Sequence, residues 1–133
     1  MELKELTEKL LLLLDCDMDI LPEKLYHALL NSRQGFLDGC IQLMGKELKT
    51  DQFQRVFQYY LADRKEKCQD FTPPSIGKLI SEIAPPHGIV YDLCAGSGSL
   101  SIQAWAAAKK PITLICEELD ERVIPFLLCN LVI

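Results

Sequence analysis

The sequence has few residues of the kinds that hold zinc. Its 133 residues include six cysteines but no C-x-x-C pair, and the two histidines, His27 and His87, lie far apart. Zinc sites use closely spaced cysteines and histidines, so we expect no bound metal. The cysteines are Cys16, Cys40, Cys68, Cys94, Cys116 and Cys129. Most stand among apolar residues, which is typical of buried free thiols in a reducing compartment and favours the cytoplasm.

Basic charge and long apolar runs are also scarce. Lys and Arg number 14 against 19 Asp and Glu, which gives a net charge of −5. Nucleic-acid-binding domains usually carry a basic surface, so DNA contact would need a local patch such as Arg64, Lys65 and Lys67. The favoured interpretation of that charged segment is a solvated helix end, and a phosphate-contacting patch is the alternative. The leucine run at 10–14 is too short to cross a membrane and lacks a signal-peptide pattern.

The first half of the chain repeats apolar residues at helical spacing. The repeating sets are Leu3, Leu6, Leu10 and Leu13; Leu25, Ala28 and Leu29; Leu37, Cys40, Ile41 and Met44; and Phe53, Val56, Phe57, Tyr60 and Leu61. Such spacing predicts amphipathic helices, and Thr50 or Asp51 is a capping candidate for the fourth. Four helices with short connections predict a small bundle, the helical region, over residues 1–68.

The second half, residues 69–133, alternates helices with short strands. The predicted elements are a helix with Ile76, Leu79, Ile80 and Ile83 on one face, a strand at 89–93, a glycine turn at 94–98, a helix at 99–108, a strand at 112–116 and a helix from about 120 to 131. This order predicts two parallel strands joined by a crossover helix. Trp105, Cys94 and Cys116 are expected to pack in the interior.

The glycine turn is typical of a nucleotide-type binding site. A strand ends in Asp92, turns on Gly96 and Gly98, and enters a helix whose first N–H groups are free. Glu118 follows Gly98 by 20 residues, near the separation of about 20 expected for an acid on ribose hydroxyls. Glu117 is the alternative for that role. The plainer interpretations are a tight strand–helix turn and a solvated carboxylate at a helix start.

The turn lacks two features of phosphate-binding loops. It has no third glycine for G-x-G-x-x-G and no G-K-[ST] sequence. A ligand with a ribose but no pyrophosphate therefore fits better, and S-adenosylmethionine is such a ligand. Backbone N–H groups can meet its carboxylate, and Asp92 can meet its ammonium.

Three motifs in order resemble the N6-adenine DNA methyltransferases, especially the modification subunits of restriction systems. Residues 71–73 resemble the family's F-T-P motif, 92–98 its D-x-x-x-G-S-G turn, and 118–120, followed by Asn130, its E-[IL]-[ND] motif. The resemblance covers roughly 69–133, with the front of the chain similar to the family's amino-terminal helices. It implies an α/β, helix-rich fold in which the helical region precedes a truncated Rossmann-like core with two parallel strands.

The resemblance also implies S-adenosylmethionine as cofactor. The residues expected to bind it are Phe71, Thr72, Pro73, Asp92, Ala95, Gly96, Ser97, Gly98 and Glu118. Thr72 can instead cap the next helix, with Pro73 at its first position.

The family's catalytic [DN]-P-P-[YF] motif is absent, since neither Pro73-Pro74 nor Pro85-Pro86 has the required neighbours. We therefore assign no catalytic residue and expect a cofactor-binding fragment that is inactive alone. The implied partners are DNA and, for the whole protein, specificity or restriction subunits. Two alternatives stay open: a non-catalytic assembly module, and a methyltransferase core acting on RNA or protein.

Two features predict self-association, or that the sequence is part of a longer protein. The first strand would have an unpaired edge, and strand edges recruit other chains. The apolar segment 124–133 would have no sheet to cover it.

Overall fold

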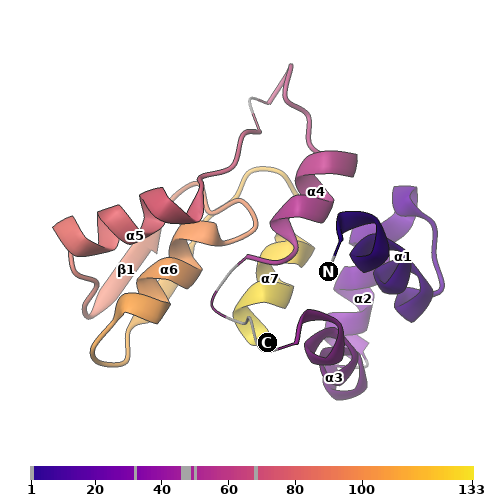
Figure 1. Cartoon of the computed structure of the whole chain (residues 1–133), viewed down its shortest axis with the longest axis horizontal. Coiled ribbons are helices and arrows are strands. Elements are labelled where there is room, and N and C mark those ends of the chain that lie inside the picture. Colours follow the sequence, from indigo (N-terminus) through magenta and orange to yellow (C-terminus); the bar gives the residue numbers. More distant parts are fainter. Residues whose placement is uncertain (1, 32, 46–48, 50, 68) are drawn as a thin grey trace.

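Helices make up most of the described chain, and Figure 1 shows strand β1 beside α5 and α6. In the described residues β1 forms a two-stranded sheet with β2. The computed structural model describes residues 2–31, 33–45, 49, 51–67 and 69–133. The helices are α1 (Leu3–Leu14), the short 3-10 helix η1 (Met18–Ile20), α2 (Leu21–Asn31), α3 (Arg33–Met44), α4 (Gln54–Tyr60), α5 (Pro74–Ile83), α6 (Ser99–Ala107) and α7 (Ile124–Val132), and the strands are β1 (Ile89–Asp92) and β2 (Thr113–Cys116). The predicted α/β, helix-rich class is confirmed. Thr50 and Cys68 lie outside the described residues.

Most residues of the predicted helical stripes of the first half lie in one apolar core, whereas Leu13, Ile41 and Tyr60 are exposed. Leu10, Leu25 and Phe57 are fully buried, and they come from α1, α2 and α4 respectively. Phe53 holds the cap position of α4 and makes no side-chain cap, but the nearby Asp51 Oδ1 accepts a hydrogen bond at 2.8 Å from the N–H of Gln54, the first residue of the helix. Most of the predicted apolar positions are thus packed in the core, whereas the capping candidate Asp51 bonds to the start of α4 without holding its cap position.

Helix α7 joins this same core, which corrects the prediction that residues 124–133 stay uncovered. Phe126 and Cys129 are fully buried, and α7 packs against α2 (Figure 1). The helix begins at Ile124 rather than near Asp120, because Asp120 and its neighbours form a hydrogen-bonded turn. The last helix therefore joins the Rossmann-like part to the helical region.

The sheet consists of β1 and β2 paired in parallel, with Ile89 opposite Thr113 and Asp92 opposite Cys116. Helices α5 and α6 pack together beside it. Gly77 allows their close approach, because a Cβ there would lie 2.8 Å from Gln103 Cγ. The order of elements along the chain, strand β1, glycine turn, helix α6 and strand β2, is as predicted.

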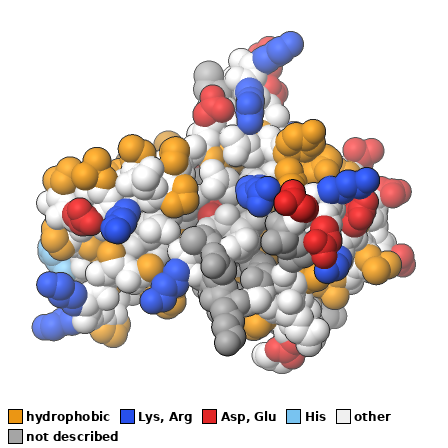
Figure 2. Space-filling view, viewed as in Figure 1, with side chains coloured by type: hydrophobic (Ala, Val, Ile, Leu, Met, Phe, Trp, Pro, Cys, Tyr) orange, Lys and Arg blue, Asp and Glu red, His pale blue; other side chains and the backbone are white. Residues whose placement is uncertain are grey.

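An apolar surface remains exposed around the sheet and α5. The predicted stripe of α5 is at least 42% exposed at each position, and Tyr91 on β1 is 54% exposed. Figure 2 shows hydrophobic side chains gathered where α5 lies, on the left. Trp105, at 54%, and Cys94 are also exposed, so their predicted interior positions are wrong. The apolar spacing predicted helix α5 correctly, but in the described structure the apolar face of that helix remains exposed.

Candidate binding site

Two glycines shape the turn after β1. Gly96 and Gly98 have φ angles of 55° and 100°, in the left-handed region that strains a residue with a Cβ. A Cβ on Gly98 would also lie 2.9 Å from Leu127 Cδ1, and one on Gly96 3.3 Å from Phe71 Cε1. Both glycines are thus required by backbone shape and by packing.

A cleft of about 520 Å³ opens beside the glycine turn. This volume falls within the usual range for small-molecule sites. The lining residues are Phe57, Glu66, Lys67, Gln69, Asp70, Phe71, Thr72, Leu93, Cys94, Ala95, Gly96, Ser99, Leu100, Glu118, Leu119, Asp120 and Val123. Three segments far apart in sequence therefore meet at one space: the chain before α5, the glycine turn, and the chain after β2.

Five of the predicted site residues line this cleft and four do not. Those that line it are Phe71, Thr72, Ala95, Gly96 and Glu118. Outside the lining, Asp92 accepts a hydrogen bond from Ser101 Oγ at 2.7 Å, and Ser97 is fully buried. Pro73 takes the cap position of α5, with no side-chain cap, so Thr72 does not cap that helix. Gly98 occupies the cap of α6.

The two neighbouring acids after β2 differ in where their side chains go. The Glu118 carboxylate accepts hydrogen bonds from the backbone N–H of Gly96 at 2.8 Å and of Asp120 at 2.9 Å. Glu117 is exposed, accepts from the Tyr91 hydroxyl at 2.6 Å and thereby raises the pKa of Tyr91. Only Glu118 lines the cleft, and α7 begins well after it, so it is not a helix-start carboxylate.

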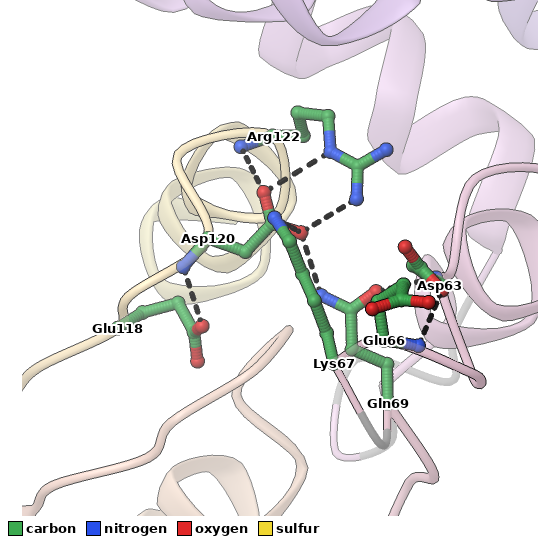
Figure 3. A network of polar contacts seen from close by, with 7 residues as sticks. All are labelled: Asp63, Glu66, Lys67, Gln69, Glu118, Asp120 and Arg122. Atoms are coloured by element: carbon green, nitrogen blue, oxygen red, sulfur yellow. Dashed lines mark hydrogen bonds and ion pairs between the residues drawn. The ribbon is translucent and has the colours of Figure 1, made fainter.

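Asp120 organises one wall of the cleft; the sequence placed it in the third motif but assigned it no binding or structural role. Its side chain is 5% exposed and accepts hydrogen bonds from Gln69 Nε2 at 2.6 Å and Arg122 Nη2 at 2.7 Å, with Lys67 Nζ at 3.0 Å (Figure 3). The hydrogen bond from Arg122, aided by Lys67 and Gln69, outweighs desolvation and holds the pKa of Asp120 far below its ordinary range. This network ties the segment before Phe71 to the chain after β2.

The prediction that the charged segment 63–67 forms the end of a helix is wrong, because α4 already ends at Tyr60. Within it, Lys67 pairs with Asp120 at the cleft, and Arg64 lies 3.7 Å from Asp70. The positive charges of these two side chains thus face nearby carboxylates.

A family model of N-6 DNA methylases matches residues 46–123. The chain belongs to this family. The match takes in the glycine turn, the F-T-P segment and Glu118, and it begins earlier than residue 69, where the motif resemblance started. No curated protein and no solved structure gives a significant match.

The family identifies a DNA-methylase domain, so the activity associated with it is methyl transfer to DNA. Of the helices in the described part of the chain, none has the length and apolar character needed to cross a membrane. Those same residues contain no group of three His, Cys, Asp or Glu side chains placed to hold a metal ion.

Proposed function

We propose that this N-6 DNA methylase domain binds S-adenosylmethionine in the cleft, as the cofactor-binding part of an adenine-N6 DNA methyltransferase. The observation that carries the proposal is that Thr72, Gly96 and Glu118 line one space of about 520 Å³. These residues come from the three motifs of the resemblance.

The chemistry of the lining suits a nucleoside. A carboxylate such as Glu118 can accept from both hydroxyls of a ribose. Apolar side chains of Leu93, Leu100 and Val123 on the walls suit a flat base. Asp92 lies outside the lining and accepts from Ser101 through Oδ2, so contact with the ammonium of the methionine end stays a proposal that the cleft lining does not support.

The cofactor supplies the methyl group, and the described residues supply binding and orientation. The sequence has no [DN]-P-P-[YF] motif to hold an adenine, so we expect this chain to bind cofactor without methylating DNA alone. We further propose that the substrate of the methyltransferase is DNA. Its partners would be specificity or restriction subunits, and its location the cytoplasm.

Calorimetry with S-adenosylmethionine and its demethylated product tests the cofactor assignment. Glu118→Ala should weaken binding by about tenfold or more, because hydrogen bonds to a charged group contribute about 1.5–3 kcal/mol each. Glu117→Ala is the matched control and should bind as the wild type does, since Glu117 lies outside the cleft lining. A wild-type protein that binds neither compound, or equal losses in both variants, would contradict the proposal.

We also propose that the exposed surface of α5 and the sheet pairs with a second copy of the chain. In the described structure the sheet has only β1 and β2, so each strand has an open edge beside apolar side chains. Light scattering should give twice the monomer mass. Ile83→Lys, on α5 at 75% exposure, should shift the protein toward monomer, whereas Leu12→Lys, on α1 at 82%, should not. A wild type that stays monomeric at all concentrations would rule this out.

A further inference from the structure

Asp51 lies against the glycine turn although it belongs to the chain before α4. Its Oδ1 accepts from Gln54 N–H at 2.8 Å and from Asn130 Nδ2 at 2.7 Å. Its Oδ2 accepts from Ser99 Oγ at 2.9 Å and from Ser97 Oγ. Four donors from α4, α7 and the turn with its helix therefore converge on one carboxylate.

The hydrogen bond from the start of α4 does not account for this arrangement. It uses only Oδ1, whereas both bonds to Oδ2 come from serines of the turn and α6. Asn130 adds a parallel tie, because its Nδ2 also donates to the Ser97 carbonyl at 2.8 Å. Both the hydroxyl and the carbonyl of the buried Ser97 are thus satisfied from outside the turn.

The opposite side of the turn faces the cleft. Gly96 N–H points to Glu118 there, and Ala95 N–H donates to the Glu117 carbonyl at 3.0 Å. The turn is consequently held between the chain after β2 and the carboxylate of Asp51. Loss of Asp51 would leave the Ser97 hydroxyl buried without that acceptor, a state that proteins avoid.

We propose that Asp51 is a positioning residue that fixes the shape of the glycine turn and so keeps Gly96 and Ala95 in place at the cleft. Its effect on cofactor affinity rests on the proposed function, but its effect on the turn does not. Burial raises the pKa of Asp51, while the four hydrogen bonds oppose that rise. The ionised form of the carboxylate is therefore stabilised by these four donors. The surrounding contacts are to neutral groups: Ser97, Ser99, Asn130 and the Gln54 backbone.

Hydrogen–deuterium exchange in the ligand-free protein measures the turn directly. Asp51→Ala should raise exchange at the amides of residues 95–98 by about tenfold or more, because local opening is no longer opposed by the carboxylate. Asp51→Asn should give a smaller rise, since its amide keeps one acceptor oxygen. Leu25→Ala is the control for lost stability, because Leu25 is fully buried in α2 and does not line the cleft.

Calorimetry with S-adenosylmethionine then separates positioning from general destabilisation. At a temperature where all variants are folded, Asp51→Ala should bind about tenfold more weakly, Asp51→Asn should recover part of that loss, and Leu25→Ala should bind as the wild type does. If the wild type does not bind but the turn exchanges faster in Asp51→Ala, Asp51 keeps its role and the cofactor assignment fails.

The inference is overturned if Asp51→Ala leaves exchange at 95–98 unchanged, or if Leu25→Ala raises it equally. Should Asp51→Ala not fold, Asp51→Asn decides. Faster exchange confined to the turn supports the inference, and wild-type exchange overturns it.

Discussion

Phe126→Ala should lower the free energy of unfolding by about 3–5 kcal/mol, the usual cost of removing a fully buried phenylalanine. Phe126 has no exposed surface, and its ring meets Phe57 edge-on at 5.4 Å and Phe53 at 6.4 Å. Truncation leaves a cavity where α7 meets the helical region. Because small domains are stable by only about 5–15 kcal/mol, the loss is a large share of the total.

Urea denaturation followed by circular dichroism measures this loss. Leu128→Ala is the matched control, because Leu128 lies on the same helix with 36% exposure and should cost about 1 kcal/mol or less. Equal losses in the two variants would mean that α7 does not pack on the helical region. The effect should also reach the cleft, since Phe57 meets Phe71 at 6.0 Å.

Asp120→Ala should lower the free energy of unfolding by about 1–3 kcal/mol at pH 7, because three side chains lose their shared acceptor. The cost stays below that of a fully buried ion pair, since Lys67 and Arg122 are 46% and 44% exposed and can be hydrated. Glu121→Ala is the control, as the neighbouring acid is exposed. A loss no greater than that of the control would show that the network contributes nothing to stability.

The same variant predicts a pH dependence. The folded state holds the pKa of Asp120 below its ordinary value, so its contribution is complete above the unfolded pKa of about 3.9 and is lost as pH falls through the folded value. The difference in unfolding free energy between wild type and Asp120→Ala should therefore be constant near neutrality and narrow below about pH 4. Denaturant titrations at several pH values check this, and a difference that does not narrow in acid contradicts it.

Local patterns in the sequence indicated part of the cleft lining. Gly96 and Gly98 predict a turn with left-handed backbone, and Glu118 follows Gly98 at the spacing expected for a ribose-binding acid. The structure agrees with these two predictions because each depends only on a few consecutive residues or on the distance between two neighbouring strands. The prediction that Thr72, Gly96 and Glu118 meet around one space agrees with the cleft lining. Cofactor binding by those residues stays a prediction.

Long-range contacts were outside the reach of those patterns. The sequence offered Asp51 only as a capping candidate, but its bonds to Ser97 and Asn130 span 46 and 79 residues. Asp120 was expected inside a helix, yet its carboxylate binds Gln69 from 51 residues away, and the helix starts later. Trp105 is a residue type that is often buried, yet it is exposed here. Burial depends on which helix or strand packs against a side chain and not on the residue type alone.

By itself, therefore, the amino-acid order determined the helices, the parallel pair of strands, the glycine turn and the family, since these follow from spacing and backbone preference. Only the tertiary structure decided that α7 completes the core of the helical region, that Asp51 binds the serines of the glycine turn and that Asp120 joins the chain before α5 to the chain after β2. Those contacts require segments dozens of residues apart to be packed together before any side chain can find its partner.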